Sequence, residues 1–199
     1  MVNELFGIPV YSTKLEQHEK YKQDFSSYIT DDKFFTVNEN WSSKTQTTLN
    51  NSYNNELPWS DLVSEIHKHL NEYIKIFQPK VNYTIETTGW MNRYFKGDYQ
   101  EQHNHVNENN IFSCAYMLDV PENSGNFVFV NTALDFYSYT GFDNMFNVSP
   151  VRSFIPPLNE GDLIIFPSYV EHFVSKNLSD KTRATVSMNF TIKENNNGI

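Results

Sequence analysis

The segment that decides the fold is residues 162–193, which read DLIIFPSYVEHFVSKNLSDKTRATVSMNFTIK. Three runs of apolar and β-branched residues stand within it, at 162–166, 170–175 and 182–193, and turn-forming residues separate them. Short runs of this composition, bounded by turn residues, predict β-strands rather than helices. The C-terminal part of the chain is therefore expected to consist of short strands.

Further runs of the same kind extend the predicted β-region back to Tyr83. They are residues 83–95, 111–119, 126–131 and 151–155. Turn-favouring residues such as Lys96-Gly97-Asp98 lie between the runs and mark their ends. Many short strands after a helical front predict a sandwich or barrel that is backed by helices.

The helical front has its clearest signal at residues 58–77. Leu62, Ile66 and Leu70 recur there at the spacing of one helix face. Pro58 suits a first turn, and Pro79 ends the pattern. One amphipathic helix is therefore expected to cover the β-region.

The rest of the N-terminal part has weaker patterns. Residues 5–11 predict a strand at a sheet edge, because Pro9 cannot donate to a ladder. Residues 13–28 have weakly helical spacing, and residues 31–56 predict loop and short helix. Residues 31–56 and 132–149 are long and polar or aromatic, so we expect them to overhang a barrel mouth and contact substrate.

Length and composition bound the class of protein. A chain of 199 residues predicts one domain, residues 1–199, with a front at 1–79, a core at 80–194 and a tail at 195–199. The formal net charge of −9 makes nucleic acid a disfavoured partner. A single cysteine, Cys114, and the lack of a signal-peptide pattern or a long apolar run predict a cytoplasmic protein with no membrane span.

Six histidines are the first candidates for chemistry, and their spacing separates them. Residues i and i+2 of an extended segment point to one side, so His103 and His105 can hold one metal ion, which His172 could join. The alternative is that the pair is simply exposed in the polar stretch QEQHNHVNEN. We predict ordinary surface or boundary positions for the other three histidines, which are His18, His67 and His69.

Arg183 lies eleven residues after His172, in a strand whose neighbours are apolar. A buried guanidinium needs an anionic partner, and its planar fork suits a carboxylate. That carboxylate could belong to a ligand or to a structural salt bridge within the chain.

Taken together, His103-Asn104-His105, His172 and Arg183 resemble the 2-oxoglutarate and Fe(II)-dependent oxygenase superfamily. The resemblance covers roughly residues 83–193. In that superfamily a His-x-Asp or His-x-Glu motif and a distal His hold the metal, and an Arg or Lys about ten residues further on binds the far carboxylate of 2-oxoglutarate. A subgroup found in bacteria and marine phages tends to show His-x-His, as here.

The resemblance implies a double-stranded β-helix, of the jelly-roll or cupin-like kind, with supporting N-terminal helices. It implies an enzyme that uses Fe(II), 2-oxoglutarate and O2 to hydroxylate a small molecule or a protein side chain in the cytoplasm of a bacterium or phage-infected host. The cosubstrate contacts that it implies, besides Arg183, are Asn92, Tyr94, Tyr116 and Thr185.

The departure from the superfamily pattern is His105, which stands where a carboxylate is usual. Three neutral imidazoles would leave the site one unit more positive. Alternatively Glu101, Glu108 or water could complete the metal site. A three-His cupin-like dioxygenase or isomerase without 2-oxoglutarate, and a non-enzymatic jelly-roll binding or virion-associated module, are the other readings of these residues.

Overall fold

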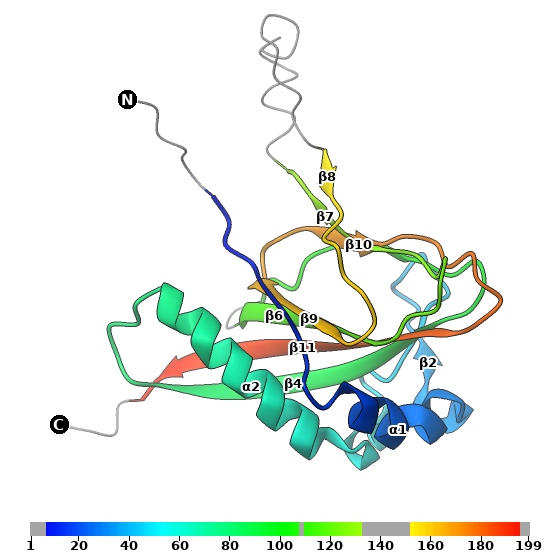
Figure 1. Ribbon diagram of the computed structural model, residues 1–199, viewed down its shortest axis with the longest axis horizontal. Helices are drawn as coiled ribbons and strands as arrows, with labels where there is room; N and C mark the ends of the chain where they lie inside the picture. Colours follow the sequence, from blue (N-terminus) through cyan, green and yellow to red (C-terminus); the bar gives the residue numbers. More distant parts are fainter. Residues whose placement is uncertain (1–6, 108–109, 133–151, 196–199) are drawn as a thin grey trace, which may run out of the picture.

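Two antiparallel sheets stacked over a pair of helices make up the computed structural model, which describes residues 7–107, 110–132 and 152–195 (Figure 1). The larger sheet has seven strands in the order β1-β9-β6-β11-β4-β3-β2, and the smaller has four in the order β5-β10-β7-β8. The strands of the larger sheet are β1 Tyr11–Lys14, β2 Thr36–Val37, β3 Gln46–Thr47, β4 Tyr83–Tyr94, β6 Asn110–Asp119, β9 Asp162–Pro167 and β11 Arg183–Glu194. Those of the smaller sheet are β5 Gln100–His103, β7 Phe127–Val130, β8 Ser153–Phe154 and β10 His172–Val174.

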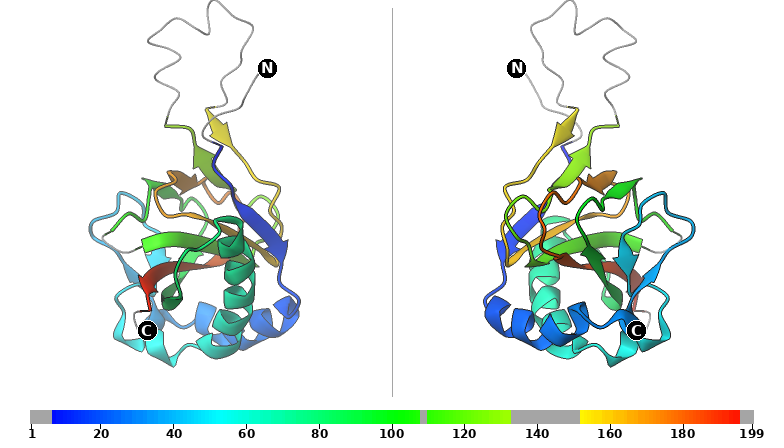
Figure 2. Two further views of the ribbon diagram at one scale, coloured as in Figure 1. Left: turned by 90° about the vertical axis from the view of Figure 1, so that its left-hand side faces the viewer. Right: turned by 90° about the vertical axis from the view of Figure 1, so that its right-hand side faces the viewer.

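The helices α1 (His18–Ile29) and α2 (Trp59–Ile76) cover the outer face of the larger sheet, as both side views show (Figure 2). Two short 3-10 helices follow in the connections: η1 (Asp32–Phe34) lies between α1 and β2, and η2 (Ser52–Glu56) lies between β3 and α2. The buried stripe of α2 packs on the sheet with the helical spacing that the sequence predicts; it comprises Leu62, Ile66, Leu70, Tyr73 and Ile74. The helix expected at 58–77 is confirmed.

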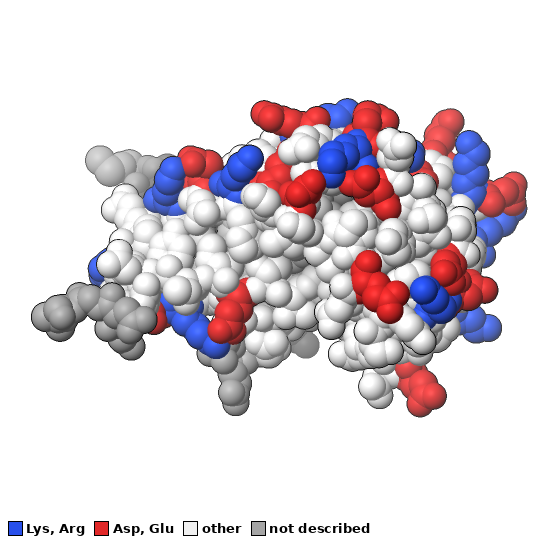
Figure 3. Space-filling view, turned by 90° about the horizontal axis from the view of Figure 1, so that it is seen from below, with Lys and Arg blue, Asp and Glu red and all other residues white. Residues whose placement is uncertain are grey.

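The helix-bearing face is charged at its rim (Figure 3). Acidic and basic side chains are interspersed there, and Lys20 of α1 lies 2.8 Å from a carboxylate oxygen of Asp24 and 2.7 Å from one of Asp61. Pairs as exposed as these contribute little to stability. Among the described residues, no helix is long and apolar enough to cross a bilayer.

The larger sheet has a core on each of its faces. One core lies between this sheet and the helices, and the other lies between the two sheets. Strand β6 contributes side chains to both cores. Cys114 and Leu118 belong to the core on the helix side, whereas Ala115 and Met117 belong to the core between the sheets. Alternation along the strand therefore assigns each β6 side chain to one side.

The predicted strands from residue 83 onward all appear, and the fold is the expected double-stranded β-helix with supporting helices. Residues 5 and 6 of the strand predicted at 5–11 lie outside the described residues. Residues 7–10 are not in a strand, and β1 begins at Tyr11, where pairing with Ile165 of β9 starts, so the predicted position is wrong for the described part. Strand β1 does lie at a sheet edge, as expected. Residues 31–56 contain the predicted loop and short helices, η1 and η2, and two short strands that were not predicted. Strand β5 was not predicted either, because its residues lack an apolar face.

His18 is not the surface or boundary residue that its spacing predicted. It is buried at the start of α1, where its Nδ1 lies 2.7 Å from the hydroxyl of Tyr116. His67 and His69 of α2 are only partly buried, and their rings form hydrogen bonds with the hydroxyls of Thr87 and Tyr11 respectively.

Candidate active site

Three histidines converge between the two sheets. His103 ends β5, His172 begins β10, and these two residues pair directly across the smaller sheet. His105 follows two residues after His103, and one ring nitrogen from each of the three lies within 4.8 Å of the others. This is the only such group of potential metal ligands in the described parts of the chain.

Hydrogen bonds to the histidine rings fix their tautomers. Nδ1 of His103 lies 2.7 Å from the carbonyl oxygen of Glu101, and Nδ1 of His172 lies 2.9 Å from that of Val170. Nδ1 of His105 lies 2.6 Å from Oδ1 of Asn189. Because each partner oxygen accepts, each Nδ1 carries the proton, and each Nε2 keeps a lone pair that can bind a metal ion.

Burial keeps these three rings neutral. Desolvation lowers the pKa of His103, lowers that of His105 to about 4, and lowers that of His172 well below its usual range. Neutral imidazole is the form that binds metal, so the cluster suits a divalent transition metal such as Fe(II).

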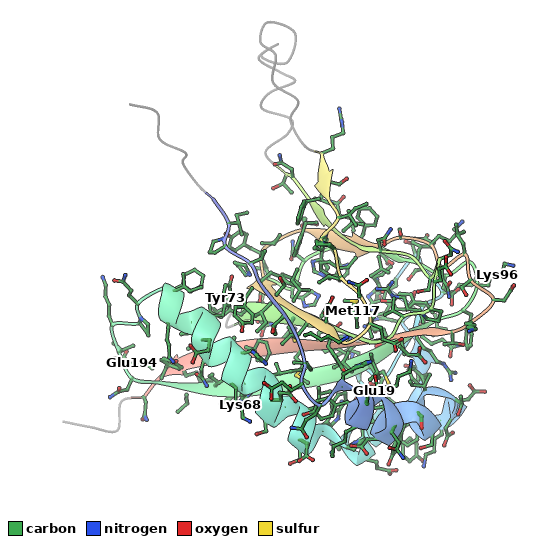
Figure 4. All side chains as sticks on the ribbon, in the orientation of Figure 1. Glu19, Lys68, Tyr73, Lys96, Met117 and Glu194 are labelled. Atoms are coloured by element: carbon green, nitrogen blue, oxygen red, sulfur yellow. The ribbon has the colours of Figure 1, made fainter. Side chains whose placement is uncertain are left out.

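Aromatic side chains wall the cluster. The ring of Phe127 stacks on His172 at a centroid distance of 5.1 Å, and Trp90 lies 5.6 Å from His105. The cavity around the histidines has a volume of about 310 Å³ and draws its lining from both sheets. Met117 of β6 is one of these lining residues and lies between the sheets (Figure 4).

Arg183 lines the same cavity from the first position of β11 and is only 1% exposed. Its Nη1 donates to the carbonyl oxygen of Gly125, and its Nη2 lies 3.3 Å from the sulfur of Met117. Its Nε has no hydrogen-bond partner in the part of the chain that the structure describes. No carboxylate of the described residues pairs with it, which excludes the structural salt bridge within those residues. A buried cation of this kind calls for an anionic ligand.

A family model for 2OG-Fe(II) oxygenases matches residues 88–189, which are just over half of the chain and include the three histidines and Arg183. The chain belongs to this oxygenase family. The cofactors of the family are Fe(II), 2-oxoglutarate and O2, and the three histidines beside Arg183 fit the first two. The readings without 2-oxoglutarate and without enzymatic activity are therefore set aside.

Three solved structures with the same fold can be aligned with most of the oxygenase chain. The prolyl-4-hydroxylase of Pseudomonas putida is 10% identical, with a TM-score of 0.58 and 92% of each chain covered. HygX of Streptomyces hygroscopicus, solved with nickel and 2-oxoglutarate, is 12% identical, with a TM-score of 0.59 and coverage of 92% of this chain and 83% of HygX.

The third structure is a prolyl hydroxylase of Trichoplax adhaerens, in complex with a peptide of a hypoxia inducible factor. It is 10% identical, with a TM-score of 0.61 and coverage of 92% of this chain and 83% of the hydroxylase. At these identities the likeness is one of fold alone. No curated protein matches the oxygenase by sequence.

Of the cosubstrate contacts implied by resemblance, three line the cavity of the oxygenase with Arg183: Asn92, Tyr94 and Thr185. Arg183 pairs with Tyr94 across β11 and β4, and Thr185 pairs with Asn92. Among the described residues, Oδ1 of Asn92 is buried without a hydrogen-bond partner.

Tyr116 does not line the cavity, so the expectation that it faces the pocket is wrong. Its hydroxyl contacts His18 on the helix side of β6, and its ring packs edge-on against Tyr21. Side chains alternate along a strand, so the neighbours Ala115 and Met117 face the cavity instead.

Glu101 does not reach the histidines either. Its carboxylate accepts from the backbone N–H of Ser42 at 2.8 Å and from Nε2 of Gln100 at 2.9 Å. Glu108, the other acidic alternative, lies outside the described residues, as do residues 133–149 of the second predicted substrate loop.

Sequence reasoning missed several residues that line the cavity. Trp90 shares a face of β4 with Asn92 and Tyr94, and Asn189 shares a face of β11 with Arg183 and Thr185. The period-2 pattern of a strand could have found these two. The segment 31–56 contributes Trp41 and Leu49 to the lining, which agrees with its expected place at the mouth.

Proposed function

We propose that this oxygenase hydroxylates a C–H bond of a small molecule or a protein side chain, with Fe(II) held by His103, His105 and His172. Arg183 receives the far carboxylate of 2-oxoglutarate, with Tyr94, Thr185 and Asn92 beside it. One observation carries the proposal: three neutral imidazoles line the same cavity as a buried guanidinium that has no carboxylate partner among the described residues.

Bound Fe(II) with 2-oxoglutarate and O2 supplies oxidative decarboxylation of the cosubstrate to succinate and CO2, coupled to oxidation of a C–H bond. The chain contributes binding, orientation and exclusion of water. Arg183 presents donors to a carboxylate from a site that is almost fully buried, where a charge-assisted hydrogen bond is strong. The aromatic walls Trp90, Phe127 and Phe166 keep water away from the reacting centre.

The charge of the site favours an anionic cosubstrate. The three imidazoles are neutral, so they leave both positive charges of a divalent ion uncompensated, and Arg183 adds a third. Ionised 2-oxoglutarate brings two negative charges. We infer that His105 in place of a carboxylate strengthens binding of the dianion.

We expect the substrate to enter the cavity over lining residues that have no assigned role in binding iron or 2-oxoglutarate. Trp41, Leu49 and Val106 line the cavity, and Val106 is 63% exposed. Nucleic acid is a poor substrate candidate because the formal net charge is −9. We further propose that residues 1–199 act as one domain, since the N-terminal helices pack directly on the sheet that carries Arg183. A cytoplasmic location is proposed on a separate ground, the single cysteine of the sequence.

Anaerobic titration of the apo-protein with Fe(II), and then with 2-oxoglutarate, tests this proposal. Bidentate chelation by 2-oxoglutarate is expected to produce a weak visible metal-to-ligand charge-transfer band. The band should be lost in His172→Ala, which removes a metal ligand, and weakened in Arg183→Ala, which removes the carboxylate partner. Iron binding without the band would contradict the cosubstrate site, and failure to bind iron would contradict the metal site.

A further inference from the structure

We propose that Asn189 is the positioning residue that makes His105 a metal ligand. This inference rests on the proposed function, because it takes His105 as the third ligand of iron. Asn189 lies on β11 in the larger sheet, whereas His105 follows β5 of the smaller sheet. Their contact therefore joins the two sheets at the metal site.

The three histidines are held in different ways. Nδ1 of His103 and Nδ1 of His172 each bond to the carbonyl oxygen of the residue two positions earlier in the chain. These partners are backbone atoms that come with the local conformation. His105 lies beyond the last residue of β5, and its Nδ1 bonds to a side chain, Oδ1 of Asn189, at 2.6 Å.

A buried hydroxyl pair fixes the orientation of the Asn189 amide. Ser113, adjacent to Asn189 in the β6–β11 register, donates to its Oδ1 at 2.9 Å. The hydroxyl of Ser113 in turn lies 2.8 Å from that of Ser168. Both serines are buried, at 0% and 1% exposure. With Ser113 donating to Oδ1, the amide oxygen rather than the NH₂ group faces Nδ1 of His105.

Ser168 also forms a hydrogen bond with the backbone of His105. The N–H of His105 donates to the carbonyl oxygen of Ser168 at 2.9 Å. His105 is thus held at its main chain by Ser168 and at its ring by Asn189, and Ser113 joins the two. Because both the main chain and the ring of His105 are held, its Nε2 stays directed at the other two histidines. A side chain without these hydrogen bonds, placed after a strand end, would be free to turn away.

The neutral amide of Asn189 also affects the net charge of the metal site. A carboxylate at position 189 would accept the same hydrogen bond and add a negative charge next to the metal ligand. Asn189 provides the acceptor without that charge, so it fixes the tautomer and leaves the site positive for a dianionic cosubstrate.

Anaerobic Fe(II) binding to three variants, with the His105 tautomer read by ¹⁵N NMR in the apo-protein, tests the proposal. Asn189→Leu removes the acceptor at similar volume and should weaken Fe(II) binding roughly 10–100-fold, the usual effect of losing such a partner. It should also give a mixture of His105 tautomers. Asn189→Asp keeps the acceptor and should keep both the Fe(II) affinity and the single tautomer, while weakening 2-oxoglutarate binding.

Thr88→Val, at the exposed position opposite Asn189 in the β4–β11 register, is the matched control and should change neither measurement. If Asn189→Leu does not fold, Ser113→Ala frees the amide and should produce a smaller loss in the same direction. Unchanged Fe(II) affinity and an unchanged tautomer in the folded variant would overturn the role of Asn189.

His105→Ala separates this inference from the proposed function. If His105→Ala weakens Fe(II) binding but the Asn189 and Ser113 variants do not, the metal site stands and the positioning role fails. If His105→Ala leaves Fe(II) affinity unchanged, His105 is not a ligand, and the proposed metal site fails together with the inference that rests on it.

Discussion

The hydroxyl of Tyr116 lies 2.7 Å from Nδ1 of His18, on the face of β6 that points away from the three-histidine cluster. This buried contact joins α1 to the larger sheet. Tyr116→Phe should remove it and leave the His18 nitrogen unpartnered, which costs roughly 1–3 kcal/mol of unfolding free energy. Urea unfolding measures that loss. The affinity for 2-oxoglutarate should stay unchanged, and a weaker affinity at full stability would contradict this placement of Tyr116.

Arg183→Lys keeps the positive charge but loses the planar fork. We expect it to weaken 2-oxoglutarate binding by about 1.5–3 kcal/mol, the range for a hydrogen bond to a charged group. That range corresponds to roughly 10–100-fold. The charge-transfer titration measures the change, and Fe(II) affinity in the same sample is the internal control. Equal 2-oxoglutarate affinity in the variant would show that the guanidinium fork does not bind the cosubstrate.

Gly125→Ala should impair both stability and cosubstrate binding. Gly125 has a φ of +89°, and a Cβ there would overlap the carbonyl oxygen of Ser175. The turn would have to shift, and with it the Gly125 carbonyl that accepts from Arg183. Urea unfolding and the 2-oxoglutarate titration measure the two effects.

Gly97→Ala is the matched control for that substitution. Gly97 has a similar φ of +92°, but a Cβ there has open space around it. Its cost should be limited to about 1–2 kcal/mol of backbone strain. Equal losses of stability in the two variants, with unchanged 2-oxoglutarate affinity, would show that the contact with Ser175 has no consequence for Arg183.

Glu160 should make stability depend on pH in the acid range. Burial alone would raise its pKa, but hydrogen bonds from Lys22 and the N–H of Val120 outweigh burial and lower the pKa to about 2. A depressed carboxyl pKa stabilises the folded protein above the ordinary value of 4.5, and this contribution is lost as pH falls toward 2. Because the pair is partly exposed, we expect about 1 kcal/mol or less.

Comparison with Glu160→Gln measures this contribution. The variant should be less stable than the natural protein at pH 7, and the difference in unfolding free energy should shrink as pH falls from 4.5 toward 3. The glutamine resembles the protonated acid, so the two proteins converge. A difference that stays constant over this interval would show that ionisation of Glu160 does not contribute.

The fold was predictable where local pattern and environment agree. Helix α2 has apolar residues on one face because it covers one side of a sheet, so its spacing alone predicts it. Strand β5 has no such signal, since its polar residues take their conformation from pairing with β10. Its last residue, His103, was nevertheless recognised, because imidazoles two residues apart suggest a metal site in any extended segment.

The orientation of Tyr116 was not predictable for a physical reason. Residues Phe112–Leu118 of β6 are all buried, since helices cover one face of the strand and the smaller sheet covers the other. Alternation of polar and apolar residues, which normally reveals which side chains point inward, is absent from such a strand. Its phase could therefore not be assigned by inspection of the sequence.

By itself the sequence determined the order His103, His105, His172 and Arg183 and the chemistry that these residue types permit, because ligand character belongs to the side chain and the i, i+2 spacing belongs to the backbone. Only the tertiary structure decided that Arg183 is buried without a carboxylate partner among the described residues and that Asn189 accepts from His105. Those relationships depend on which strands become neighbours, and the strand orders of the two sheets arise from non-local pairing that local sequence does not encode.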